Sequence, residues 1–282
     1  MNRRTFITAG TGFALLSSPI QAVLGQTTTK TGRLKQSVAR WCFGAIPIES
    51  FCRQLRDMGV TGMDLASPDE WGVCKRYGIT PTMAFGGGSF LQAEEGSGRQ
   101  FGRAFGWNKP ENHAELIRSV RESIELAGKS GVGAIIGLFG DSEGMSVEEG
   151  IDNCVTGLRQ IVPELEKNNI TLAIELLNSL VDHPDYQGDN TAFGVEVCRR
   201  VGSEMIRLVY DAYHMQIMEG NLINTIRENI NYIFHIQIAG VPGRNEIDET
   251  QEVNWRAVAT AIAEINFQYS LAGMLAEAIT IN

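Results

Sequence analysis

The sequence predicts a (β/α)₈ barrel, a single α/β domain in which eight parallel strands alternate with helices. Eight short apolar runs typical of buried parallel strands alternate with longer segments of helical periodicity. The chain has 282 residues, a usual length for one such barrel. A doubly wound α/β sheet is the alternative, but its usual glycine fingerprint does not follow the first expected strand.

Each element follows from local pattern. We expect strands at 38–43, 62–65, 79–85, 132–139, 170–175, 206–211, 232–238 and 269–274. We expect helices at 48–58, 67–77, 112–129, 146–167, 190–201, 222–230 and 255–265, and a last short helix after strand eight. Gly59 is a typical helix stop, and 146–149 has a capping-box pattern that begins at Ser146. The glycine-rich stretch 86–108 lacks phosphate-binding motifs, so we interpret it as a mobile lid over the site.

The first residues are typical of an export signal. Arg3 and Arg4 precede a short apolar core at 10–16, and small or polar residues follow to position 26. This predicts a twin-arginine signal at 1–26, a linker at 27–36, a barrel domain at 37–282 and a periplasmic location. No later segment approaches about 18 uninterrupted apolar residues, so we expect no membrane span in the mature form.

Composition narrows the classes of partner. The net charge is −9, which argues against nucleic acid or an anionic membrane as a partner and leaves a small molecule. Five scattered cysteines without a CxxC motif favour core positions over a disulfide framework or a metal site. They are Cys42, Cys52, Cys74, Cys154 and Cys198.

The stretch 206–214 carries the first candidate site residues. An apolar run ends in Asp211, and His214 follows three residues later. On an extended strand residues three apart point to opposite faces. The two side chains can therefore share a site only if the strand stops near Asp211 and the chain turns.

Oxygen-bearing side chains lie near the ends of three consecutive strands. Glu175 closes strand five, Asp211 closes strand six and Gln237 lies late in strand seven. Successive strand ends lie side by side in a barrel, so the three can converge on one cation, for which Mg²⁺ or Mn²⁺ suits best. Each also has a structural interpretation: a lysine pair for Glu175, a turn cap for Asp211 and a hydrogen-bonded strand position for Gln237.

The four histidines divide into two groups. His183 follows strand five on the expected active-site side and, like His214, is a candidate to contact substrate. His235 lies two residues before Gln237 and so deeper in the barrel, where a satisfied core histidine is at least as good an interpretation. His113 lies in the first turn of a helix, where a structural or solvated role is expected.

Four blocks resemble the hydroxypyruvate isomerase family of xylose isomerase-like TIM barrels, some of whose bacterial members carry a twin-arginine signal. They are 172–179, 182–186, 210–221 and 239–248. The resemblance implies Glu175, Asp211 and Gln237 as metal ligands and Glu175 as an acid/base group. It implies His183, His214 and Arg244 near the substrate. The implied reaction is isomerisation of a small hydroxy-keto acid or sugar through an enediolate, as in hydroxypyruvate to tartronate semialdehyde.

The sequence departs from this family at its end. Family members have a glutamate at the end of strand eight, a fourth ligand and second acid/base group, whereas 269–282 has none there. Ala272 is followed directly by what resembles the family's terminal helix, as a short deletion would produce, and Glu277 is the one nearby acid. A water, His214 or Glu277 would be the second proton carrier. A ketose epimerase and a non-catalytic sugar-acid-binding barrel stay as alternatives, and a homo-oligomer is compatible with either.

Overall fold

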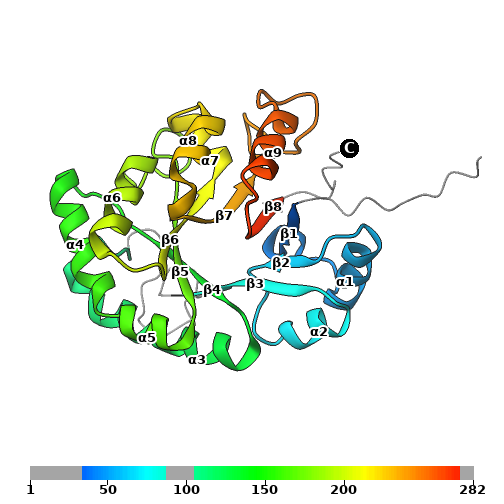
Figure 1. The fold of residues 1–282 in the computed structure, drawn as a ribbon, viewed down its shortest axis with the longest axis horizontal. Coiled ribbons are helices and arrows are strands. Elements are labelled where there is room, and N and C mark those ends of the chain that lie inside the picture. The colour runs from blue at the N-terminus through cyan, green and yellow to red at the C-terminus, as the bar shows by residue number, and fades with distance from the viewer. Residues whose placement is uncertain (1–33, 87–104, 274–282) are drawn as a thin grey trace, which may run out of the picture. The chain divides into compact units, whose positions relative to one another are not determined.

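The chain folds into a closed parallel barrel in which the eight strands pair in chain order and the last pairs with the first (Figure 1). The computed structural model describes residues 34–86 and 105–273. The strands are Lys35–Ala39 (β1), Gly62–Asp64 (β2), Thr80–Phe85 (β3), Ala134–Leu138 (β4), Thr171–Leu176 (β5), Ile206–Asp211 (β6), Ile233–Ile238 (β7) and Ser270–Gly273 (β8). The predicted fold class is therefore confirmed.

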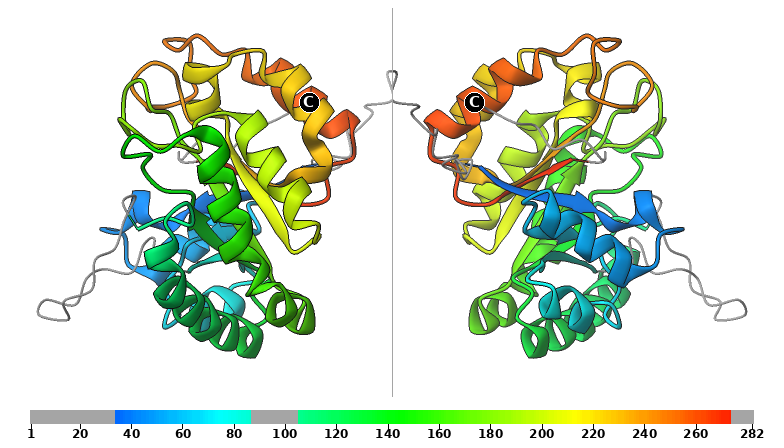
Figure 2. Two further views of the ribbon diagram at one scale, coloured as in Figure 1. Left: turned by 90° about the vertical axis from the view of Figure 1, so that its left-hand side faces the viewer. Right: turned by 90° about the vertical axis from the view of Figure 1, so that its right-hand side faces the viewer.

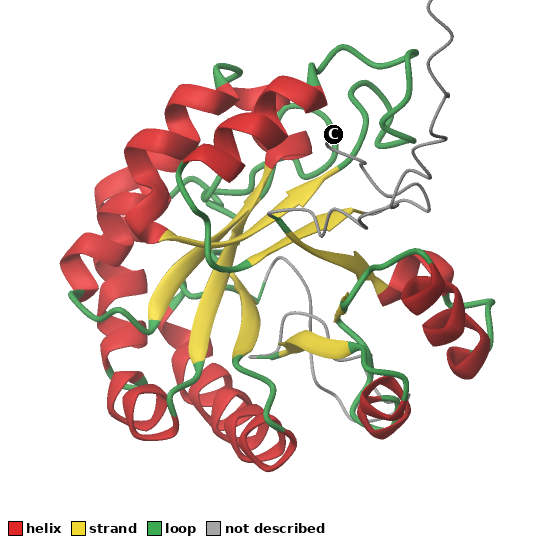
Figure 3. Cartoon of the chain, turned by 45° about the vertical axis from the view of Figure 1, so that its right-hand side comes forward, coloured by secondary structure: helices red, strands yellow, loops and turns green. Residues whose placement is uncertain are grey.

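Helices surround the strands (Figure 3). They are Ile48–Asp57 (α1), Trp71–Arg76 (α2), His113–Ser130 (α3), Val147–Arg159 (α4), Val162–Asn168 (α5), Thr191–Val201 (α6), Ala212–Met218 (α7), Leu222–Asn229 (α8) and Trp255–Glu264 (α9). Short 3₁₀ turns lie at Arg40–Phe43, Pro110–Asn112 and Ile230–Tyr232. No helix within the described ranges combines the length and the apolar character that a bilayer crossing needs.

Strand side chains alternate between two cores, as period two requires. On β5, Leu172, Ile174 and Leu176 join the large apolar cluster between strands and helices. Ala173 belongs instead to a small separate cluster with residues such as Met83, Ile136 and Val209, which fills the barrel interior. Glu175 shares the inward face with Ala173, two residues nearer the carboxyl end of the strand.

Several element boundaries differ from the sequence prediction, most clearly at β1 and in the expected helix 146–167, and α7 was not predicted. β1 begins at Lys35 rather than at residue 38, because its pairing with β2 ends at Ala39 and the next four residues form a 3₁₀ turn. Arg40 stabilises that turn by donating hydrogen bonds to the carbonyls of Phe43 and Ile46. The expected helix 146–167 is broken, because Pro163 has no N–H to bond the carbonyl of Arg159.

All strands are parallel, so their carboxyl ends meet at one end of the barrel. Figure 2 shows from two sides that the loops after β4, β5 and β7 project at this end. The twin-arginine segment 1–26, most of the linker 27–36, most of the expected lid 86–108 and the terminal helix with Glu277 lie outside the described residues. The site is therefore built from β5, β6, β7 and the loops that follow them.

Candidate active site

Asp211 lies where strand six becomes a helix. β6 ends at Asp211 and α7 begins at the next residue, so the stop and turn that a shared site with His214 requires are present. One carboxylate oxygen, Oδ1, accepts a hydrogen bond of 2.9 Å from the backbone N–H of Tyr213 and so caps α7. The other, Oδ2, faces the site. The structural interpretation of Asp211 as a cap is thus correct, and it leaves one oxygen for chemistry.

Glu175 brings a second carboxylate to the same place. Glu175, Asp211 and His214 each offer one ligand atom, and these three atoms lie within 4.8 Å of one another, all on buried side chains. Burial, followed by the nearby charge of Asp211, raises the pKa of Glu175 to about 8, although Arg244 opposes the shift. Ionising both buried carboxylates costs free energy unless a cation lies between them. Without a cation, one of the two is expected to keep its proton.

Gln237 lies beside Asp211. The two residues are direct partners in the β6–β7 register, and Gln237 is buried. The same row continues into strand eight at Ala272, which pairs with Gln237 and is also buried. The row thus presents a carboxylate, an amide and then a methyl group. The structure places no acid on strand eight within the described part of the chain.

His214 enters the site from the first turn of α7 and is fully buried. Its Nδ1 lies 2.7 Å from Nδ2 of Asn178, and its Nε2 lies 3.5 Å from Oδ2 of Asp211. Burial lowers the pKa of His214 to about 4, although Asp211 opposes the shift. The imidazole is therefore neutral at pH 7.

His183 lies on the loop after β5, at the edge of the site. Its ring centroid is 5.3 Å from that of His214, and the rings are inclined at 53°. The loop is anchored by Asp182, whose Oδ2 accepts hydrogen bonds from Asn178 and from the hydroxyl of Tyr213. His183 thus lies beside His214 at the site.

Arg244 reaches the site from the loop after β7. The loop is closed by a hydrogen bond of 2.8 Å from the N–H of Gly240 to the carbonyl of Asn245, and Arg244 has a left-handed φ of 57°. The guanidinium lies between two rings, 5.8 Å from the centroid of Trp41 and 5.3 Å from that of Tyr213. Its Nη2 donates to Oδ2 of Asp211 at 3.1 Å.

The other histidines have structural roles. Nε2 of His235 lies 2.6 Å from Oδ2 of Asp64 on β2, and both are buried inside the barrel. The hydroxyl of Thr82 donates to the other oxygen of Asp64. His113 is buried rather than solvated, with Nε2 2.8 Å from the carbonyl oxygen of Trp107.

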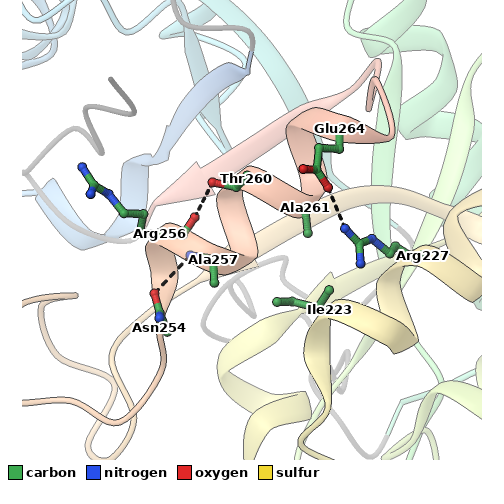
Figure 4. A pocket seen from close by; sticks show the side chains of 8 residues that line it. All are labelled: Ile223, Arg227, Asn254, Arg256, Ala257, Thr260, Ala261 and Glu264. Atoms are coloured by element: carbon green, nitrogen blue, oxygen red, sulfur yellow. Dashed lines mark hydrogen bonds and ion pairs between the residues drawn. The ribbon is translucent and has the colours of Figure 1, made fainter.

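The cysteines and the α8–α9 surface lie apart from this chemistry. All five cysteines are free, and four of them are buried, as the sequence predicts. An open pocket lies between α8 and α9 on the outside of the barrel, where Arg227 pairs with Glu264 (Figure 4). It contains none of the predicted site residues.

Two contributors were not predicted. Asn178 follows Glu175 by three residues, and its importance depends on contacts within the loop that no periodicity reveals. Trp41 was assigned to a strand, whereas the structure exposes 53% of it at a 3₁₀ turn beside Arg244.

The donor set fits a hard divalent cation. Glu175 and Asp211 offer carboxylate oxygens, and Gln237 lies next to Asp211 with an amide oxygen to offer. Oxygen donors of this kind suit Mg²⁺ or Mn²⁺. The raised pKa of Glu175 is the expected mark of a carboxylate that lacks a positive partner. Arg244 neutralises Asp211 in part, but it leaves Glu175 without a hydrogen-bonded cation among the described residues.

These features define a barrel with a polar site at the carboxyl ends of strands five to seven. A model of the xylose isomerase-like TIM barrel family matches residues 52–272, and the chain belongs to that family.

Curated relatives and solved structures agree with this assignment. The hydroxypyruvate isomerase of Escherichia coli (strain K12) is 34% identical over 147 residues, which cover 52% of this chain and 56% of the relative. The 2-oxo-tetronate isomerase of Cupriavidus necator is 34% identical over 100 residues, covering 36% of this chain and 33% of the relative. Four vertebrate relatives are matched over only 34% to 42% of their length.

A crystal structure described as AP endonuclease, family 2, from Brucella melitensis has a TM-score of 0.71. It is 19% identical and covers 86% of this chain and 93% of that chain, a likeness that concerns the fold alone.

Proposed function

We propose that this protein is a divalent-metal-dependent isomerase of a small hydroxy-keto acid or sugar. The observation that carries the proposal is the meeting of two buried carboxylates, Glu175 and Asp211, at the ends of adjacent parallel strands. The names of the matched relatives, hydroxypyruvate isomerase and 2-oxo-tetronate isomerase, support the substrate class.

Glu175, Asp211 and Gln237 would hold the cation. When bound, Mg²⁺ or Mn²⁺ would supply Lewis-acid polarisation of the substrate carbonyl. Glu175, ionised in the loaded site, would accept a proton from the hydroxyl-bearing carbon next to that carbonyl. Return of a proton to the former carbonyl carbon, together with passage of the hydroxyl proton to the former carbonyl oxygen, would complete an isomerisation. Hydroxypyruvate and tartronate semialdehyde, for example, would interconvert in this way through an enediolate.

The remaining groups bind and orient the substrate. Arg244 presents a guanidinium beside Asp211 and suits a substrate carboxylate. His214 and His183 lie together beside Asp211 and would contact substrate oxygens. Closing the site to water would strengthen each of these interactions.

One observation favours a second candidate function, a catalytically impaired or non-catalytic barrel that binds sugar acids. Ala272 pairs with Gln237 and so occupies the strand-eight position of the row that contains Asp211. An acid at this position would provide a second proton carrier opposite Glu175, and the described residues have none there. A ketose epimerase would return the proton to the carbon that lost it, on the opposite face of that carbon.

Solvent deuterium uptake separates these candidates. The full chain is incubated in D₂O with Mn²⁺ or Mg²⁺ and hydroxypyruvate, tartronate semialdehyde or small ketoses, and the substrate is followed by NMR. Exchange that needs the cation and stops with a chelator supports the isomerase or epimerase, and product identity separates the two. Cation binding with no exchange into any of these compounds would support the binding barrel instead.

Location and assembly complete the proposal. The twin-arginine pattern of the first residues supports export to the periplasm, where a sugar-derived acid is the expected substrate. The acidic chain favours small molecules over nucleic acid as partners. Cell fractionation with the first 26 residues present or deleted tests the location.

A further inference from the structure

The side-chain amide of Asn178 has a fixed orientation. Its Oδ1 accepts two backbone hydrogen bonds, from Val181 at 3.1 Å and from Asp182 at 2.8 Å. Its Nδ2 donates to the carboxylate Oδ2 of Asp182 at 2.7 Å. Exchanging the amide O and N atoms would set an NH₂ group against two N–H donors and an oxygen against a carboxylate. Three contacts therefore assign which end of the amide faces His214.

The end that faces His214 is the donor. Nδ2 of Asn178 lies 2.7 Å from Nδ1 of His214, and its second hydrogen is the one available for this contact. Because Nδ2 carries no lone pair to accept a hydrogen bond, Nδ1 of the imidazole must be the acceptor. A neutral imidazole with an accepting Nδ1 carries its proton on Nε2.

The Nε2–H group points into the site. Nε2 is buried and has no hydrogen-bond partner in the part of the chain that the structure describes. Oδ2 of Asp211 lies 3.5 Å away, in reach for attraction but long for a hydrogen bond. Leaving a buried donor without a hydrogen-bond partner costs free energy. A ligand oxygen that accepts a hydrogen bond from Nε2–H would therefore be bound favourably.

We propose that Asn178 is a positioning residue that holds His214 as the Nε2–H tautomer and so makes His214 a hydrogen-bond donor to a substrate oxygen. The assignment rests on the proposed function for the identity of the ligand, but not for the tautomer. It excludes His214 as a ligand of the cation, although its Nε2 lies close enough to Glu175 and Asp211 to suggest one. It also excludes His214 as the second base, because Nε2 has no free lone pair.

Nitrogen NMR of histidine-labelled protein reads the tautomer directly, without substrate or activity. Long-range ¹H–¹⁵N spectra of the wild-type protein at pH 7 should show a protonated Nε2 and an unprotonated Nδ1 for His214. The signals are assigned by their loss in His214→Asn. A protonated Nδ1 with a free Nε2 would overturn the proposal.

Asn178→Asp tests the cause. The substitution keeps the shape but replaces the donor with an acceptor, so Nδ1 should gain a proton, giving either the Nδ1–H tautomer or the imidazolium. Asn224→Asp is the matched control, because it makes the same change of charge on an exposed turn of α8 and should leave the His214 signals as in the wild type. An unchanged Nε2–H tautomer in Asn178→Asp would contradict the role of Asn178.

Adding ligands separates this inference from the proposed function. With saturating Mg²⁺ the Nε2 proton should stay in place, and hydroxypyruvate should then shift the Nε2 signal. Displacement of the Nε2 proton by the cation would overturn the exclusion of His214 as a ligand. The wild-type protein could show the Nε2–H tautomer and yet respond to neither cation nor substrate. This result would contradict the proposed function and the donor role of His214, while the tautomer assignment would remain valid.

Discussion

The barrel holds two buried pairs of an acid and an imidazole, and they differ in how fully they are satisfied. In the lower pair, His235 contacts Asp64 at 2.6 Å, and Thr82 donates to the other carboxylate oxygen. In the upper pair, Nε2 of His214 stays 3.5 Å from Asp211, with Glu175 close to both. Burial alone would raise the pKa of Asp64, but His235 and its hydrogen bonds lower it, whereas the pKa of Glu175 rises to about 8.

The difference separates a structural pair from a site. Asp64 and His235 hydrogen-bond to each other, and Asp64 also accepts from Thr82, so a ligand would add few polar contacts there. Glu175, Asp211 and His214 lie farther apart and are neutralised only in part, by Arg244 at Asp211, so a ligand or cation can supply interactions that the described residues do not. Four predictions test this contrast, from the largest expected effect to the smallest.

Replacing the proposed proton carrier should have the largest effect. Glu175→Gln keeps the size of the side chain but removes the base, so deuterium exchange into substrate should fall by roughly 10²–10⁴-fold. The measurement is the NMR exchange rate with saturating Mn²⁺. Glu204→Gln, at an exposed position outside the site, is the control and should exchange at the wild-type rate. Exchange that survives in Glu175→Gln would assign the base elsewhere.

Breaking the lower pair should cost folding stability. Asp64→Asn leaves the imidazole of His235 buried without its carboxylate, and removing one partner of such a pair typically costs about 3–5 kcal/mol. Urea unfolding of the metal-free protein measures the loss. Asp211→Asn is the comparison and should lose much less, because its amide oxygen can still cap α7. Equal losses of unfolding free energy in the two variants would show that the two pairs contribute equally to stability, against the proposed contrast.

Glu175, beside the upper pair, should contribute a loss of stability of the metal-free protein as the pH rises from about 4.5 to 8. The pKa of Glu175 is raised from its ordinary value of 4.5 to about 8, so the folded chain holds this proton more tightly than the unfolded chain. Through Glu175, the free energy of unfolding should fall between about pH 4.5 and pH 8, by a few kcal/mol at most, with no further change from this group above that window. His214 acts in the opposite direction between about pH 4 and pH 6.5, because its pKa is lowered from 6.5 to about 4 in the folded chain. Urea unfolding of the wild type and of Glu175→Gln isolates the contribution of Glu175 as the difference in free energy of unfolding at each pH. This difference, wild type minus variant, should fall across the window, and a difference that stays constant or rises would contradict the burial argument.

Restoring an acid on strand eight should have the smallest effect. Ala272 pairs with Gln237 in the row that contains Asp211, so Ala272→Glu adds a carboxylate to the donor set. We expect the affinity for Mn²⁺ to rise by roughly tenfold, corresponding to about 1.4 kcal/mol. Ala272→Gln is the control of equal size and should give a smaller gain. Calorimetry measures both, and an unchanged affinity in the glutamate variant would remove Ala272 from the cation row.

The strand ends could be predicted from the sequence because they depend on periodicity alone. Glu175, Asp211 and Gln237 each end or nearly end an apolar run, and a barrel brings such ends together whatever the loops do. Sequence pattern also predicted that His235 would lie deeper than Gln237, and its pairing with a buried acid agrees.

Contacts across long sequence separations could not be predicted. The partner of His235 is Asp64, which is 171 residues away in the chain, and no local pattern joins them. Asn178 depends on the turn that gives its Oδ1 two backbone donors, and a single asparagine after a strand does not predict that turn. Trp41 was placed on a strand because its apolar run continues past Ala39, where the pairing with β2 ends.

Calorimetric titration of Mn²⁺ into the metal-free protein tests the central claim most directly. The account predicts one site per chain and, at pH 7, release of close to one proton, because Glu175 is mostly protonated below its pKa of about 8 and must ionise to bind the cation. Binding should be lost or strongly weakened in Asp211→Asn, and the proton release should disappear in Glu175→Gln. No binding by the wild-type protein, or binding that neither substitution changes, would contradict the account.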